Sequence, residues 1–218
     1  MTRRAAAARL GGLHVLADAA PGWALGPVEQ ARAACAAGAA VVQLRAKHAR
    51  DRELLAWAAE IRALTASAGA LFFVNDRFDL ALAADADGAH LGQDDLPPAR
   101  VPSEARERLL LGRSTHTLEQ AATARTEPID YVAFGPVFGT HSKPSEWSAR
   151  GLALLAEVVE RVRPLPVVAI GGIDATNAAS VRAAGAAGFA VISAVAGAPE
   201  PEAAARALLT AWRAQELA

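Results

Sequence analysis

Two cations and an amide follow a short apolar run, in the segment Gln43-Leu44-Arg45-Ala46-Lys47. If this segment ends a β-strand, the side-chain period of two places Gln43, Arg45 and Lys47 on one side. An arginine fork matches phosphate oxygens and a lysine adds a mobile point charge, so this set suits a diphosphate group. The alternative is a solvated loop with a salt bridge to a neighbouring strand end.

Carboxylates follow the next two apolar runs, where Asp76 comes directly after Asn75 and Asp95 closes the segment His90 to Asp95. Mg²⁺ typically takes one or two protein carboxylates together with substrate phosphates. Asp76 and Asp95, beside the two cations, therefore predict a site for Mg²⁺ and a diphosphate. The alternative is that Asp76 pairs with Arg77 and Asp95 caps the following turn.

Hydroxyl and imidazole groups follow a fifth apolar run, in the segment Gly112 to Thr117. Ser114 is expected to point inward as a hydrogen-bonding group, and His116 could do acid/base work near neutral pH. The alternative for the whole cluster is helix capping by Thr117. Another histidine, His90, lies inside an apolar run and is expected to be a hydrogen-bonded core residue.

The last three strand ends carry features of phosphate binding. Thr140, Ser142 and Lys143 lie in a long polar loop that could close over phosphorylated substrates and exclude water, or could be an ordinary surface loop. Gly172 permits close approach of backbone to a ligand, and a helix starting after Ser193 would direct amide N–H groups at an anion. Such a phosphate site recurs in barrels after strands seven and eight.

Elements that could position these groups recur along the chain. The expected strands are Leu13 to Leu16, Ala40 to Leu44, Leu71 to Val74, Gly88 to Leu91, Leu109 to Leu111, Tyr131 to Phe134, Val167 to Ile170 and Phe189 to Ile192. The clearest expected helices between them are Asp51 to Thr65, Leu118 to Arg125, Leu152 to Arg163 and Ala203 to Ala214. This alternation predicts βαβ units and a parallel sheet.

An open doubly wound sheet and a closed barrel both fit this alternation. Eight units, and the lack of a glycine-rich turn after the first strand, favour a single (β/α)8 TIM barrel over residues 1–218. Residues 1–11 are expected to fray. In such a barrel the chemistry lies at the carboxyl ends of the strands, where the polar residues above are found.

Composition excludes several other classes of protein. The 218 residues carry 22 Lys+Arg against 23 Asp+Glu, so a nucleic-acid partner is not expected. Cys35 cannot form an internal disulfide and is expected to pack in a helix. No apolar run is long enough to span a bilayer, and the basic N-terminus lacks a secretory apolar segment. We expect a cytoplasmic protein without a membrane partner; a homo-oligomer is compatible with these features.

Read in order, six segments resemble the thiamine-phosphate synthase family: Gln43 to Lys47, Asn75 to Arg77, His90 to Asp95, Ser114 to His116, Gly135 to Lys143, and Ala169 to Ile173. Each motif alone is weak, but six at barrel-strand intervals across nearly the whole chain are specific. The resemblance implies an enzyme with Mg²⁺ as cofactor and two small phosphorylated substrates. It would join a pyrimidine diphosphate to a thiazole phosphate by dissociative loss of pyrophosphate.

The resemblance also assigns roles to individual residues. The pyrimidine diphosphate would be bound by Gln43, Leu44, Arg45, Ala46, Lys47, Asn75, Ser114 and Lys143. Of these, the catalytic residues would be Arg45, Lys47, Ser114 and Lys143. The thiazole phosphate would be bound by Thr140, His141, Ser142, Gly172, Ile192 and Ser193, and the metal by Asp76 and Asp95. Ser142, Gly139 and Arg113 depart from the family's usual threonine, proline and small aliphatic residue, which concerns loop geometry rather than the chemistry.

Two other functions compete with this one. A thiazole tautomerase of the same fold would use a histidine near strand five, but it needs no combination of Gln43, Arg45, Lys47, Asp76 and Asp95. A non-catalytic protein that binds thiazole phosphate would leave the two carboxylates unexplained. The diphosphate apparatus therefore favours the synthase.

Overall fold

Eight parallel strands form a closed barrel in this computed structural model, which describes residues 3–139 and 146–214. The strands are β1 (Gly12–Asp18), β2 (Val41–Arg45), β3 (Leu71–Asn75), β4 (Gly88–Leu91), β5 (Leu110–Thr115), β6 (Tyr131–Phe134), β7 (Val167–Ile170) and β8 (Gly188–Val191). Each pairs with the next in sequence order, and β8 pairs with β1. The predicted TIM barrel is confirmed, and every predicted strand overlaps one of these eight.

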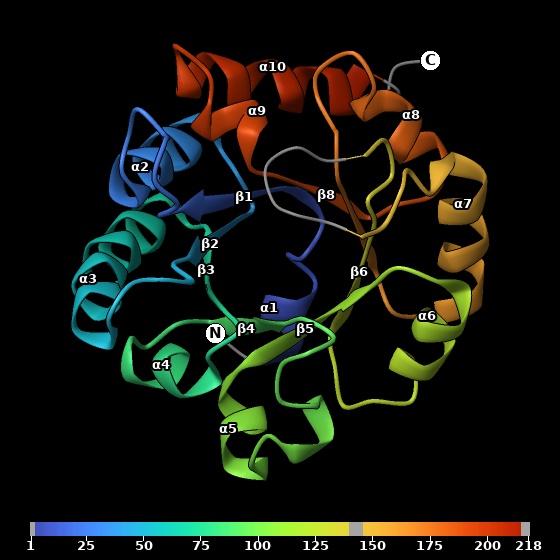
Figure 1. The fold of residues 1–218 in the computed structure, drawn as a ribbon, viewed down its shortest axis with the longest axis horizontal. Coiled ribbons are helices and arrows are strands. Elements are labelled where there is room, and N and C mark those ends of the chain that lie inside the picture. The colour runs from blue at the N-terminus through green and yellow to red at the C-terminus, as the bar shows by residue number, and fades with distance from the viewer. Residues whose placement is uncertain (1–2, 140–145, 215–218) are drawn as a thin grey trace.

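Most of the helices surround the barrel (Figure 1). The helices are α1 (Arg3–Ala7), α2 (Pro27–Ala37), α3 (Asp51–Ala68), α4 (Phe78–Ala83), α5 (Ser103–Arg108), α6 (Leu118–Ala124), α7 (Gly151–Val162), α8 (Ala178–Ala183), α9 (Ser193–Ala196) and α10 (Pro201–Arg213), with the 3-10 turn η1 (Pro98–Arg100) before α5. The four helices predicted from spacing correspond to α3, α6, α7 and α10. In the described chain none is long and apolar enough to cross a membrane.

Alternation along the strands separates two apolar layers. Leu16, Phe73 and Tyr131 belong to the cluster inside the barrel, whereas the neighbouring Val15 and Phe72 pack outward against the helices. Burying such a side chain contributes about 1.5–3 kcal/mol. Because the period is two, the same inward rows that fill the barrel end in the side chains at its mouth.

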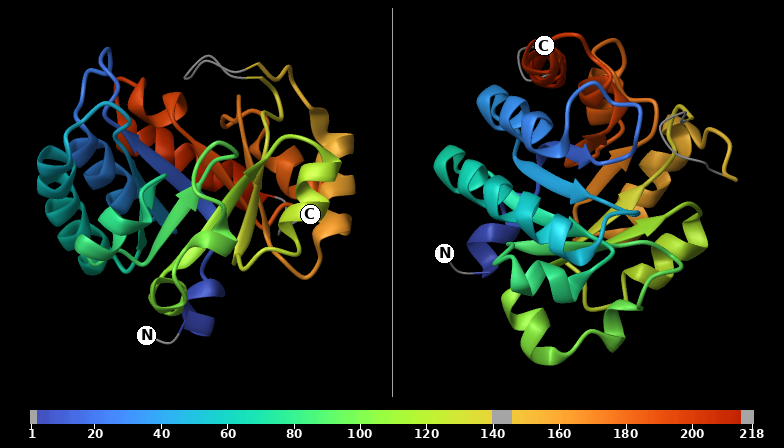
Figure 2. Two further views of the ribbon diagram at one scale, coloured as in Figure 1. Left: turned by 60° about the horizontal axis from the view of Figure 1, so that its bottom comes forward. Right: turned by 60° about the vertical axis from the view of Figure 1, so that its left-hand side comes forward.

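The helix α1 closes the opposite end of the barrel from the loops that follow β1 and β6 (Figure 2). Leu10 is fully buried and Ala6 nearly so, both within the interior cluster. The ring Nε2 of His14 lies 2.8 Å from the carbonyl oxygen of Leu10. Burial of Ala6 and Leu10 thus packs this part of the segment against the barrel, in contrast to the fraying expected for residues 1–11.

Cys35 lies in α2, half-buried against the helix–sheet core. Burial raises the pKa of its thiol to about 11. The thiol is therefore protonated and weakly nucleophilic at neutral pH, as expected for a packing residue.

Candidate active site

A cavity of about 800 Å³ opens at the carboxyl ends of the strands and receives side chains from all eight of them. Six residues predicted from the sequence line it together: Gln43, Arg45, Lys47, Asn75, Asp76 and Ser114. The side chain of Gln43 is 3% exposed, and its Oε1 has no hydrogen-bond partner among the described residues. A buried acceptor of this kind normally has a partner, which marks this wall as suited to a ligand.

The guanidinium of Arg45 is held by a buried carboxylate. Its Nη1 donates to Oδ1 of Asp18 at 2.9 Å, and the sheet register places the two residues side by side at the ends of β1 and β2. The predicted salt bridge to a neighbouring strand end therefore exists, but Arg45 also lines the cavity. Both readings of this residue hold at once.

A second ion pair joins Lys47, after β2, to Asp76, after β3, at the mouth of the barrel, with Nζ of the lysine 2.7 Å from Oδ2 of the aspartate. Asp76 has a left-handed backbone, with φ of 66°. Residues other than glycine adopt this backbone conformation uncommonly, aspartate and asparagine more often than most. Strained positions of this kind concentrate at functional sites. Burial raises the pKa of the Asp76 carboxyl; its hydrogen bond with Lys47 opposes this and its contact with Asp95 reinforces it.

The loop that carries Asp95 is anchored to β5. Oδ2 of Asp95 accepts a hydrogen bond from the Gly92 amide at 2.6 Å. Asp95 therefore closes the turn that precedes it, whereas the 3-10 turn after it has no side-chain cap, so the predicted cap of the following turn is wrong. The Arg113 guanidinium donates to the Gly92 carbonyl and lies 3.5 Å from Glu127. Arg113, one of the departures from the family pattern, therefore supports the loop rather than the cavity.

The proposed pairing of Asp76 with Arg77 is wrong. Arg77 lies 3.1 Å from Asp51 and 2.6 Å from Asp79, outside the cavity. The Asp76 carboxyl contacts that of Asp95. Asp76 lines the cavity, but Asp95 is not among its lining residues, which include the neighbouring Asp94 instead. In the described ranges no group of three or more His, Cys, Asp or Glu side chains is placed to hold a metal. Two carboxylates without further protein ligands suit an ion that completes its shell with water and phosphate.

A chain of hydrogen bonds crosses the floor of the cavity. His90 Nδ1 lies 2.7 Å from the Tyr131 hydroxyl, and its Nε2 lies 2.8 Å from Oγ of Ser114. Burial raises the pKa of the Tyr131 hydroxyl, which stays protonated at neutral pH. The prediction of a hydrogen-bonded core histidine is confirmed, and the bonds link it to the Ser114 hydroxyl in the site.

An aromatic pair flanks the cavity on the side of β5 and β6. The His116 ring stacks on Trp147 with centroids 5.2 Å apart, and its Nδ1 lies 2.6 Å from the Gly135 carbonyl oxygen. Oγ1 of Thr117 accepts from the Gln120 amide, so the predicted cap of α6 is confirmed. His116 therefore lines the cavity, and its ring both stacks on Trp147 and hydrogen-bonds with the Gly135 carbonyl oxygen.

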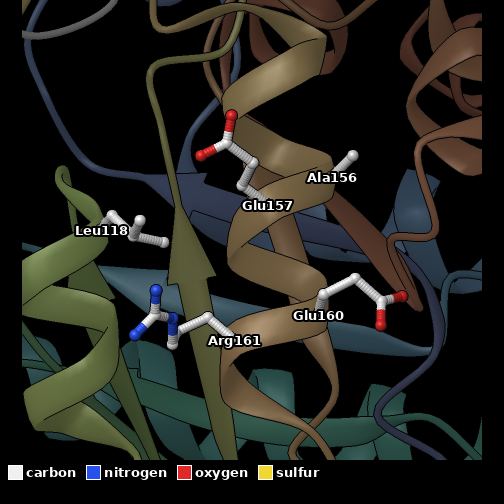
Figure 3. A pocket seen from close by; sticks show the side chains of 5 residues that line it. All are labelled: Leu118, Ala156, Glu157, Glu160 and Arg161. Carbon is white, nitrogen blue, oxygen red and sulfur yellow. The ribbon is translucent and has the colours of Figure 1, made fainter.

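Another hollow, of about 590 Å³, lies on the outside of the barrel. Leu118, Ala156, Glu157, Glu160 and Arg161 line it. Figure 3 shows Leu118 on one side and Arg161 on α7 facing it, with Glu160 directed away. This groove between α6 and α7 has none of the predicted site residues, so the barrel mouth is the candidate active site.

Comparisons with known proteins agree with this placement. The profile of the family described as thiamine monophosphate synthase matches residues 15–195. The chain belongs to this family. It is 50% identical over 207 residues to a thiamine-phosphate synthase from Anaeromyxobacter dehalogenans, covering 95% of this chain and 90% of that protein. It is 48% identical over 196 residues to one from Methanoculleus marisnigri, covering 90% and 92%.

A solved structure extends the likeness to three dimensions. Thiamine phosphate pyrophosphorylase from Pyrococcus furiosus superposes with a TM-score of 0.83 at 39% identity, covering 95% of this chain and 97% of that one. Membership in the thiamine monophosphate synthase family confirms the expected enzyme class, a thiamine-phosphate synthase.

Several residues assigned by the resemblance lie elsewhere. Leu44 and Ala46 pack in the layer between sheet and helices, because the strand alternates, and neither lines the cavity. Ile192 packs in the barrel interior, while Gly172 and Ser193 are exposed at the ends of β7 and β8. The predicted helix does start at Ser193, as the four-residue α9. Thr140, His141, Ser142 and Lys143 lie outside the described residues.

Residues of the cavity and its wall that sequence reasoning missed include Asp18, Tyr131 and Trp147. Asp18 ends the first strand, so the strand-end rule applied there would have found it. Tyr131 begins β6 and reads as an ordinary apolar strand residue. Trp147 follows a polar loop, and no local pattern predicts its contact with His116.

Proposed function

We propose that this family member condenses 4-amino-2-methyl-5-(diphosphooxymethyl)pyrimidine with a thiazole phosphate, to give thiamine phosphate and pyrophosphate. The thiazole substrate would be 4-methyl-5-(2-phosphoethyl)thiazole or its carboxylate form. The observation that carries the proposal is the convergence of Gln43, Arg45 and Lys47 with the carboxylate of Asp76 in one cavity. A diphosphate and its metal ion account for all four groups, whereas an isomerase of the thiazole alone would not use them.

The carboxylate pair fits Mg²⁺. Asp76 and Asp95 are close enough that their contact raises the pKa of Asp76. Two adjacent carboxylates repel when both are ionised, and a divalent cation relieves this repulsion. Mg²⁺ held by Asp76 and Asp95 would neutralise the charge that develops on the departing diphosphate.

The chain's own residues would then stabilise the leaving group. The C–O bond to the diphosphate breaks, its electron pair leaves with the oxygen, and the Arg45 and Lys47 charges stabilise the product anion. The remaining pyrimidine methylene cation is captured by the lone pair of the thiazole nitrogen, which forms the new C–N bond. No general base is required. Ser114 would orient the pyrimidine by a hydrogen bond, and the walls would exclude water from the cation.

The competing function is isomerisation of the thiazole carboxylate. It is supported by His116, whose ring lines the same cavity. That ring is hydrogen-bonded to the Gly135 carbonyl oxygen and stacked on Trp147. The tautomerase remains a second candidate that uses His116 and no diphosphate.

Calorimetry separates the synthase from both alternatives. The protein is titrated with the pyrimidine diphosphate in the presence of Mg²⁺ and again in EDTA. Binding that requires Mg²⁺ and is weakened by Asp76→Asn supports the synthase, because only that function uses this ligand with a metal. Absence of binding in both conditions, with thiazole phosphate still bound, would favour the tautomerase or a carrier.

A further inference from the structure

Asp18 is a buried carboxylate that the proposed chemistry does not use. It is the last residue of β1, is 1% exposed, and lies beside Arg45 in the sheet register. We propose that Asp18 is a positioning residue, which fixes the Arg45 guanidinium for the diphosphate. This inference rests on the proposed function of the site.

The two carboxylate oxygens of Asp18 have different partners. Oδ1 accepts from Nη1 of Arg45 at 2.9 Å, and Oδ2 accepts from Nε1 of Trp23 at 3.1 Å. Guanidinium and indole N–H groups only donate. A carboxylate therefore satisfies both, whereas an amide would direct its own NH₂ group at one of the two donors.

The backbone of Asp18 is fixed from the other side by Gln30 of α2, which is fully buried. The Asp18 amide donates to Oε1 of Gln30 at 2.9 Å, and Nε2 of Gln30 donates to the Asp18 carbonyl oxygen at 3.0 Å. Nε2 of Gln30 also donates to the carbonyl oxygen of Leu25 at 2.8 Å, which ties the loop after β1 to the same helix. The carboxylate is thus part of a rigid frame.

Arg45 keeps most of its donors for a ligand. Within the described ranges its side-chain hydrogen bonds go to Asp18 alone, through one of the five N–H donors of the guanidinium. The side chain is 12% exposed and lines the cavity. A positioned arginine loses less conformational freedom when it binds, which favours affinity.

A simple charge effect gives the opposite expectation. Asp18 is negative and lies next to a site for a polyanion, so removing its charge alone would tighten diphosphate binding. If Asp18 instead orients Arg45, removing the charge weakens binding, because the guanidinium is no longer held. The sign of the change therefore distinguishes the two explanations.

The test is calorimetric titration with inorganic pyrophosphate and Mg²⁺ of the wild type, Asp18→Asn, Arg45→Ala and the double variant. We expect Asp18→Asn to weaken binding about 10-fold, as for loss of a hydrogen bond to a charged group. In the Arg45→Ala background Asp18→Asn should cause no further weakening, because only the charge effect, which favours binding, remains. Unchanged or tighter binding by Asp18→Asn, or weakening that persists without Arg45, overturns the inference.

Controls separate this result from misfolding and from net charge. Glu202→Gln, in an exposed pair with Arg206 on α10, makes the same change in charge far from the cavity and should leave affinity unchanged. If Asp18→Asn does not fold, Trp23→Phe takes its place in the cycle: roughly two- to three-fold weaker binding that vanishes without Arg45 supports the inference, and unchanged affinity overturns it. Failure of the wild type to bind pyrophosphate with Mg²⁺ would instead refute the proposed function.

Discussion

Nζ of Lys47 lies 2.7 Å from Oδ2 of Asp76, so a charge pair joins the segments that follow β2 and β3 at the mouth of the barrel. The Lys47 side chain is 44% exposed, and exposed pairs of this kind contribute only about 0–1 kcal/mol to stability. Such a pair is better explained by function than by stability, since each partner also belongs to the proposed diphosphate and metal site.

Lys47→Ala should therefore separate activity from stability. We expect kcat/KM to fall by about 100-fold or more, as for loss of a preorganised charge on a leaving group. The melting temperature should move by less than about 4 °C, because 1 kcal/mol corresponds to about 2–4 °C in a chain of this size. Steady-state kinetics and calorimetric melting check both; parallel loss of activity and stability would indicate a structural role.

Asp76→Asn tests the carboxylate while respecting its backbone. Asparagine tolerates the left-handed conformation that Asp76 adopts at φ of 66°, so the fold should be retained. Activity should fall by about 100-fold or more because the proposed metal ligand loses its charge. Asp85→Asn, at the other described left-handed aspartate, is the matched control and should keep full activity.

Tyr131→Phe tests the hydrogen-bond chain on the cavity floor. The change removes the hydroxyl 2.7 Å from Nδ1 of His90 and should cost about 1–3 kcal/mol of unfolding free energy. KM for the pyrimidine diphosphate should rise several-fold, because His90 also contacts Ser114. Ser114→Ala, at the other end of this series of hydrogen bonds, should raise KM with little change in the free energy of unfolding. If Tyr131→Phe and Ser114→Ala lowered the free energy of unfolding equally, the hydrogen bonds would serve only the stability of the core.

Gly112→Ala should destabilise the barrel. A Cβ there would lie 2.1 Å from the Tyr131 ring carbon Cζ, so the ring or strand must move. Overpacking of this kind costs about 1–3 kcal/mol, measurable by urea unfolding. Gly26→Ala is the control substitution, because its Cβ would meet only the flexible carboxylate end of Glu29. The free energy of unfolding should fall by less than about 1 kcal/mol in this variant.

His14 predicts a specific pH dependence of stability. Burial lowers its pKa to about 4, so it stays neutral in the folded barrel while the unfolded chain takes up a proton near pH 6.5. Its contribution is present above that pH and is lost as pH falls toward 4, by about 2 kcal/mol between pH 7 and pH 5. In urea unfolding, the free energy of unfolding of His14→Gln should decrease less than that of the wild type between pH 7 and pH 5, by about 2 kcal/mol. Identical decreases in the two proteins would contradict a lowered pKa for His14.

The barrel and most of its mouth could be predicted because strand alternation is a local signal. The same period of two that identifies β2 also places Gln43, Arg45 and Lys47 on one side. Leu44 and Ala46 were included with them by resemblance to a continuous motif, although alternation alone directs their side chains to the outer layer.

Pairings across the barrel could not be predicted, since they depend on how distant strands are aligned. Arg77 pairs with Asp51 and Asp79 rather than with the adjacent Asp76, whose carboxylate pairs with Lys47 instead. Asp18 lies 27 residues before Arg45, and the register of β1 against β2 places the two side by side. The short alanine run interrupted by Arg9 indicates a frayed terminus, and only the tertiary fold shows that Ala6 and Leu10 are buried.

The most direct test of the account is pyrophosphate release. The protein is mixed with Mg²⁺, the pyrimidine diphosphate and the thiazole phosphate, and both pyrophosphate and thiamine phosphate are measured. If the cavity is a synthase site, the two products form in equal amounts, only when both substrates are present, and far more slowly with Lys47→Ala. Isomerisation of the thiazole carboxylate without any pyrophosphate release would contradict it and identify the tautomerase instead.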